Sequence, residues 1–284
     1  MKKHFMLLVV AGLISVTIAS CGGEEKKETE STNNEGILLR LTPQEGSVME
    51  SVVDMDITMN GDVGMSTSLA MEFNMKVDNV DAEGVITVTS EYTQMKMNMD
   101  MMGQVIRYNS DDINPTDPVS QKMAEAMGGI INTPFDMKMN DLSEIVEAPD
   151  FSKMIGNDPM MAGQADQMKQ TFDNMFAIYP ERAVNLGESW DRTTVSGNSQ
   201  MPMTLNATYT LKEILDEKVI LTIGGSVESD GGIADVKGTF TGALDIDRAT
   251  GFPIKSFMTQ RISMSVQGME VEMIMEMIMD TKVK

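Results

Sequence analysis

Two residue types that carry much of the catalytic and metal-binding chemistry of proteins are nearly missing from this 284-residue chain. It has one cysteine, Cys21, and one histidine, His4. After residue 21, no thiolate or imidazole is available as a nucleophile, general base or metal ligand, which excludes Ser-His-Asp and Cys-His catalysis and the usual zinc sites. We therefore expect no catalytic residues, no metal site and no cofactor, and we expect that the protein is not an enzyme.

The position of Cys21 points to a covalent modification. A basic start (residues 1–4) is followed by an apolar run (residues 5–18), which is typical of a secretory signal peptide and is too short to cross a bilayer as a helix. The run ends in Ile18-Ala19-Ser20-Cys21, which resembles the lipobox of bacterial lipoproteins. The resemblance implies that residues 1–20 are removed and that Cys21 carries acyl chains such as palmitate, which anchor stably when two or more are present.

Charge and composition extend this prediction. The net charge of −21 repels nucleic acid, so we expect the membrane, reached through the anchor, as a partner and no nucleic acid. Residues 22–35 contain no apolar side chain, and we interpret residues 21–35 as a disordered acidic tether. The expected location is the outer membrane. Glu24-Glu25 resembles a surface-export signal. The sequence is compatible with either orientation of the anchored domain, on the periplasmic face or on the cell surface.

Residues 36–284 show the alternation of buried strands. Every second residue is apolar, most often methionine, in several segments: 53–59, 71–77, 95–101, 205–211 and 269–279. A period of two predicts antiparallel strands with one buried and one solvated face. We predict a single, mainly β domain with two inserted helices, built on a large curved antiparallel meander sheet of about ten strands. Its halves, 36–148 and 178–284, are joined by a helical segment.

The two helices follow from changes in spacing. After Asp117-Pro118, which suits a helix N-cap and first position, apolar residues recur at helical intervals up to Ile130. A second stripe begins at Ala165 and includes Phe172 and Tyr179, with polar residues opposite. We expect this second helix, over residues 165–177, to cover the apolar face of the sheet.

Two short motifs resemble a family of bacterial outer-envelope lipoproteins known only as a domain of unknown function. They are Gly187-Glu188-Ser189-Trp190, which enters a strand, and the hairpin Asp245-x-Asp247-x-x-Thr250-Gly251. The resemblance implies a β-rich domain outside the cytoplasm, no known catalytic residues, and a packing role for Trp190. The element order is also similar to the half-barrel of periplasmic lipoprotein carriers, in which a curved sheet encloses acyl chains.

The 31 methionines are the most unusual feature of the composition. One interpretation is that they fill an ordinary core, in a structural or partner-binding envelope protein. A second is that flexible thioethers line a surface for a lipid or other hydrophobic ligand. A third is Cu(I) binding, although alternate residues along a strand lie about 6.8 Å apart, too far to share one ion. For the second, the expected lining is Met71, Met75, Met95, Met97, Met99, Phe172, Met275 and Met277.

Overall fold

The computed structural model describes residues 36–61, 64–112, 118–150, 178–198, 201–229, 234–266 and 269–284. The first half of the sheet contains β1 (Val48–Gly61), β2 (Met65–Val80), β3 (Ile86–Met101), β4 (Gln104–Asn109), β5 (Phe135–Met139) and β6 (Ile145–Glu147). The second half contains β7 (Ser189–Asn198), β8 (Met201–Ile214), β9 (Lys218–Ser229), β10 (Ala234–Asp247), β11 (Pro253–Val266) and β12 (Met269–Val283).

The strands form one open antiparallel sheet of 12 strands in the order β6-β5-β3-β2-β1-β12-β11-β10-β9-β8-β7, with β4 also paired to β3. The predicted mainly β fold with a large antiparallel sheet is confirmed. The meander holds from β1 to β4 and from β7 to β12, whereas β5 pairs with β3 and not with β4. The halves join where the first strand, β1, pairs with the last, β12. The predicted count of about ten strands was too low. Strands as short as β5 and β6, of 5 and 3 residues, carry too little alternation to be recognised.

One of the two expected helices lies within the described residues. Helix α2 (Pro118–Met127) begins at the predicted proline and packs beside β4. The expected second helix, Phe172, the tether and Cys21 lie outside the described ranges. Among the residues that the structure does describe, no helix is both long and apolar enough to cross a membrane.

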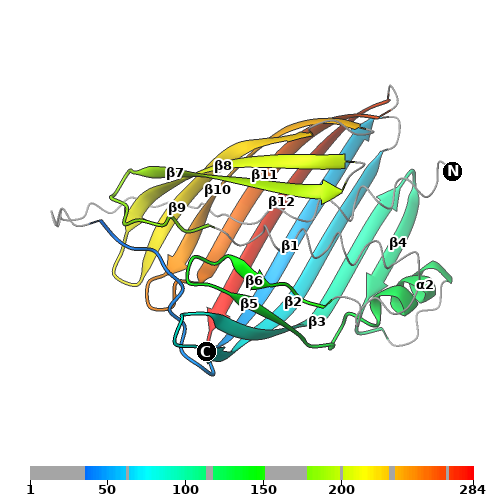
Figure 1. Cartoon of the computed structure of the whole chain (residues 1–284). Coiled ribbons are helices and arrows are strands. Elements are labelled where there is room, and N and C mark those ends of the chain that lie inside the picture. The colour runs from blue at the N-terminus through cyan, green and yellow to red at the C-terminus, as the bar shows by residue number, and fades with distance from the viewer. Residues whose placement is uncertain are drawn as a thin grey trace.

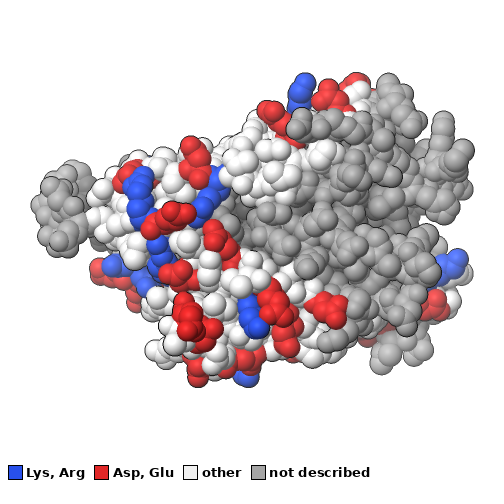
Figure 2. Space-filling model, viewed as in Figure 1, with Lys and Arg blue, Asp and Glu red and all other residues white. Residues whose placement is uncertain are grey.

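The sheet is strongly curved (Figure 1). Strands β5 and β6 at one edge and β7 and β8 at the other both lie in front of the central strands in this view. At one end the edges approach each other, since Arg192 Nη1 on β7 is 4.0 Å from Glu144 Oε1 in the turn before β6. Arg40 strengthens the same end: it pairs with Asp141 at 3.1 Å and donates to Pro180 O at 2.7 Å. Figure 2 shows acidic and basic side chains interspersed around this end.

Strand register divides the side chains between two faces. Met55 on β1 lies opposite both Met277 on β12 and Leu69 on β2, while Asp54 and Asp56 point to the other side. The side that includes Met55 also includes Arg192. Because Arg192 reaches Glu144 at the opposite edge of the sheet, the sheet curls toward this side. We call this side the concave face and the other the convex face. The concave face supplies most of the continuous hydrophobic core.

Candidate functional site

Methionine side chains line the central strands of the concave face. The register places every described member of the expected lining on this one face: Met71, Met75, Met95, Met97, Met99, Met275 and Met277. Met71 and Met95 are direct neighbours on β2 and β3. Met275 and Met277 are buried, with 0% and 3% of their surface exposed, whereas Met71, Met97 and Met99 are partly exposed. Phe172 lies outside the described residues.

Methionines also form rows that run across the strands. In one row, Met273 on β12 pairs with Met59 on β1, which pairs with Met65 on β2, which pairs with Met101 on β3. Directly opposite residues have Cβ atoms about 5 Å apart, closer than alternate residues along one strand. The rows therefore place methionines of different strands closer together than methionines along one strand, which the spacing within a single strand did not predict.

Five buried polar atoms in the described part of the protein have no hydrogen-bond partner: Thr67 Oγ1, Ser90 Oγ, Arg192 Nε, Ser256 Oγ and Gln260 Oε1. By register, all of these side chains belong to the concave face. Buried polar groups are normally paired, and each unpaired one costs about 1–3 kcal/mol, so a cluster of them on one apolar face needs an explanation. The concave face is a methionine surface with isolated polar positions.

Sequence reasoning missed these polar residues. Ser256 and Gln260 occupy alternate positions of β11 among Met258, Ile262 and Met264, and all five side chains are at most 3% exposed. The signal in the sequence is the placement of a serine and a glutamine at positions where the period of two requires apolar side chains.

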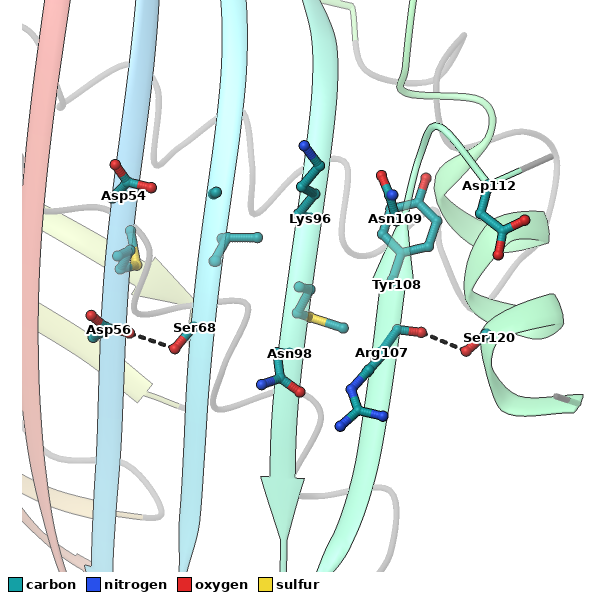
Figure 3. Close-up of a pocket in the computed structure, with 14 residues that line it drawn as sticks. Asp54, Asp56, Ser68, Lys96, Asn98, Arg107, Tyr108, Asn109, Asp112 and Ser120 are labelled. Atoms are coloured by element: carbon teal, nitrogen blue, oxygen red, sulfur yellow. Dashed lines mark hydrogen bonds between the residues drawn. The ribbon is translucent and has the colours of Figure 1, made fainter. Parts of the chain in front are cut away.

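A groove of about 760 Å³ lies across β1 to β4 and beside α2, and residues of both faces line it, since the row Met55-Leu69-Met97-Tyr108 of the concave face runs between polar rows of the convex face. Two adjacent cross-strand rows contribute to it: Asp56-Ser68-Asn98-Arg107 and Asp54-Ala70-Lys96-Asn109. Figure 3 shows these side chains on neighbouring strands, with Ser68 donating to Asp56 at 2.5 Å. Met97 is the one residue of the expected lining in this groove. In the described ranges, no group of three or more His, Cys, Asp or Glu side chains is placed to hold a metal ion.

The Gly187-Glu188-Ser189-Trp190 motif forms the start of β7. Gly187 adopts a φ of 81°, which turns the chain into the strand. Trp190 is buried, donates from Nε1 to Ile178 O at 2.8 Å, and stacks on Tyr209 with ring centroids 5.7 Å apart. The predicted packing role of Trp190 is confirmed. Burial raises the pKa of Tyr209 well above its usual value of 10.0, so this ring stays neutral.

The second motif, at the turn between β10 and β11, is also built from local contacts. Asp247 Oδ1 accepts hydrogen bonds from Thr250 N at 2.7 Å and from Thr250 Oγ1 at 2.6 Å. Gly251 follows with a φ of 74°. The motif therefore closes a short hairpin with a glycine in the left-handed conformation, as the sequence predicted.

Comparison with solved structures supports the fold. A lipovitellin structure reported for its lipid–protein interactions has a TM-score of 0.54 and 9% identity; the match covers 85% of this chain and 26% of the lipovitellin chain. The chain thus spans about a quarter of that protein's length. An outer membrane channel from Pseudomonas putida F1 matches at a TM-score of 0.29 and 8% identity, over 90% of this chain and all of that chain. This score is too low to indicate a shared fold.

No curated protein matches the sequence. A family model described as a family of unknown function (DUF6263) matches residues 83–253, more than half of the chain. The match includes the Gly187 motif and the turn that ends in Gly251, the two segments in which the resemblance to a family without assigned function was recognised. The chain belongs to this family of unknown function.

Proposed function

We propose that this protein is an acylated envelope lipoprotein that binds a lipid or other hydrophobic ligand on the concave face of its sheet. The observation that carries the proposal is the continuous methionine surface across β12, β1, β2 and β3. Unbranched, polarizable thioethers change rotamer at little cost, so such a surface repacks around apolar molecules of different shape. Branched side chains at the same positions would hold one fixed shape.

Two further observations support the proposal. The fold is similar to a part of lipovitellin, a protein whose structure was reported for its lipid–protein interactions. The unpaired polar atoms of the concave face, Gln260 Oε1 among them, are unfavourable in a core that serves only for packing. Residues 1–21 supply the proposed export signal and acyl anchor, and the proposed location is the outer membrane. We assign the chain no catalytic role, so a bound ligand is released unchanged.

The test is native mass spectrometry of two forms of the full chain. One is the wild-type protein extracted from its native membrane, and the other is Cys21→Ala, which lacks the acylation site. The expected result is a stoichiometric lipid bound non-covalently to both forms, recovered intact by solvent extraction. A ligand-free Cys21→Ala protein that also fails to take up added lipid would reject the proposal. The methionines would then be packing residues of a structural or partner-binding envelope protein.

A second candidate function is Cu(I) binding, favoured by the row Met273-Met59-Met65-Met101. Thioethers are ligands that Cu(I) prefers, and this row places them on adjacent strands. Titration with Cu(I) against a chromophoric chelator distinguishes the two functions. Competition with the chelator that is lost in Met59→Leu would favour copper. Lipid binding without such competition favours the first proposal.

A further inference from the structure

The groove across β1 to β4 carries charges of opposite sign on different strands. Asp54 and Asp56 lie on β1, whereas Lys96 lies on β3 and Arg107 on β4, and all four side chains are exposed. A further carboxylate, Asp112, lines the groove beside α2. Figure 3 shows the two carboxylates of β1 on one side, with Lys96 and Arg107 nearer to α2. The groove therefore has an anionic side and a cationic side.

These opposite charges do not neutralise each other. The ion pairs of the described residues include neither the two carboxylates on β1 nor the two cations. In the row Asp54-Ala70-Lys96 an alanine stands between the charges, which are two strand spacings, or about 10 Å, apart. Elsewhere on the convex face, Lys255 on β11 and Asp280 on the adjacent β12 do pair, at 3.4 Å.

The groove has room for a small ligand between these charges. Its volume of about 760 Å³ is in the usual range of small-molecule sites. The two polar rows flank it, and the side chains of the row between them point to the concave face by register. The backbone of this middle row therefore forms the floor, and a bound molecule meets the charged side chains at the walls.

The charges select the class of ligand. A simple anion would meet the carboxylates of the groove, and a simple cation would meet Lys96 and Arg107. A zwitterion satisfies both sides, because its ammonium group donates to carboxylates while its anionic group accepts from lysine and arginine. A quaternary ammonium group needs aromatic faces around it. The one aromatic residue of the groove lining, Tyr108, belongs to the concave face, so a primary ammonium group fits better.

The cationic side suits a phosphate group. Lys96 and Arg107 lie on a diagonal of β3 and β4, with Cα atoms about 7–8 Å apart, so a tetrahedral phosphate reaches both more readily than a planar carboxylate. Lys96 donates one hydrogen to Gln94 Oε1 at 2.7 Å and keeps two for a ligand. Asn109 and Asn98 stand directly opposite the two cations and add amide donors.

We propose that this groove binds a zwitterion of the phosphoethanolamine class. Its primary ammonium group donates to Asp54 and Asp56, and its phosphate group accepts from Lys96 and Arg107. The charged side chains of the groove belong to the convex face, opposite the methionine surface. The site is therefore additional to the proposed function and does not depend on it.

The experiment is calorimetric titration of the full chain carrying Cys21→Ala with three soluble probes. Glycerophosphoethanolamine is the zwitterion, glycerophosphoglycerol has the same phosphodiester without the ammonium group, and ethanolamine has the ammonium group alone. The zwitterion should bind about fivefold more tightly than either of the others, because an exposed ion pair contributes up to about 1 kcal/mol. Equal affinity for the zwitterion and for either half of it would overturn the proposal.

Two double variants test the two sides of the groove separately. Asp54→Asn with Asp56→Asn should abolish the preference for glycerophosphoethanolamine over glycerophosphoglycerol. Lys96→Gln with Arg107→Gln should weaken the binding of both phosphodiesters. The matched control, Lys255→Gln with Asp280→Asn, removes the same kinds of charge from the convex face outside the groove and should change neither result. Equal effects of the control and the groove variants would overturn the proposal.

Vesicles identify the source of the phosphoethanolamine group. Binding to phosphatidylcholine vesicles only when they contain phosphatidylethanolamine, with release by glycerophosphoethanolamine, would assign the site to a lipid headgroup. Binding of glycerophosphoethanolamine without vesicle binding would assign it to a free molecule, and both outcomes support the site. A Cys21→Ala protein that takes up no lipid on its concave face but still prefers the zwitterion would reject the proposed function alone.

Discussion

Tyr179 donates its phenolic hydrogen to the carbonyl oxygen of Gly251, which joins the segment before β7 to the turn between β10 and β11. The tyrosine is fully buried, and burial raises its pKa far above the usual value of 10.0, so the ring remains a neutral donor. Residues 36–42 contact both segments: Ile37 pairs with Val184, and Thr42 N donates to Thr250 O at 2.8 Å. The two motifs are therefore parts of one junction.

Gly251 is the position where this junction tolerates the least change. Its φ is 74°, and a Cβ atom would lie 1.9 Å from Arg40 O. Gly251→Ala should reduce the free energy of unfolding by more than the roughly 1–3 kcal/mol that an unfavourable backbone region costs, because a backbone clash adds to it. The control is Gly84→Ala, which has a φ of 82° and no atom within 4 Å of the added Cβ. Urea denaturation of both variants compares the two, and equal losses would contradict the predicted clash.

Trp190 should be a large single contributor to stability. Trp190→Phe removes the hydrogen bond to Ile178 O and part of the stacking area on Tyr209. We expect a loss of about 1–3 kcal/mol, and about 3–5 kcal/mol for Trp190→Ala. Circular dichroism measures both variants, since Trp190 is the one tryptophan of the chain and its fluorescence is lost with it. A loss in Trp190→Phe as large as that in Trp190→Ala would contradict the predicted order, because the phenyl ring would then recover none of the packing of the indole.

The lowered pKa of Glu188 predicts that the stability of the protein depends on pH. Its pKa is lowered from the usual value of 4.5, chiefly because Asn185 N donates to the carboxylate and also because Arg182 lies beside it. A lowered pKa in the folded state stabilises the protein above pH 4.5, and this contribution is lost as the pH falls through the lowered value. Melting temperatures of wild type and Glu188→Gln should therefore differ near pH 7 and converge in acid. A constant difference at every pH would show that the charge of Glu188 is not involved.

Much of the fold was predictable because alternation encodes it directly. The pattern Val53, Met55, Ile57 and Met59 against Asp54, Asp56 and Thr58 places each side chain on the face where the structure has it. The sequence does not encode which strands become neighbours. The pairing of β1 with β12 joins residues more than 200 positions apart, such as Met55 and Met277, and no local pattern specifies it.

The candidate site was predictable only in part, for a related reason. A period of two predicts that Met95 and Met97 share a face. It does not predict that Met71 lies beside Met95. Nor does it predict the cross-strand row formed by Gln260, Met275, Ile57 and Thr67. Rows depend on register, which turn lengths and bulges set. One bulge lies between Glu72 and Phe73 in the pairing of β2 with β3.

Acylation of Cys21 is the prediction that tests the proposed location of the protein at the outer membrane. Intact mass of the protein extracted from its native membrane should exceed that of residues 21–284 by two or three acyl chains with their glyceryl group. Cys21→Ala should leave the membrane fraction or accumulate as an uncleaved precursor, because a single remaining apolar segment is too short to anchor stably. A soluble, unmodified wild-type product that begins at another residue would contradict the prediction.

Substitution of the central methionines tests whether flexibility is what they contribute. Met275→Leu with Met277→Leu keeps the apolar volume of two buried side chains, so each change should cost less than about 1.5 kcal/mol of stability. Leucine is branched and repacks less freely than an unbranched thioether. If the proposed function holds, the double variant should bind fatty acids of one chain length about as well as wild type and those of shorter or longer chains several-fold more weakly. The matched control is Met102→Leu, at a turn position that is 74% exposed, which should leave the chain-length profile unchanged. An unchanged profile in the double variant as well would mean that these methionines act by volume alone.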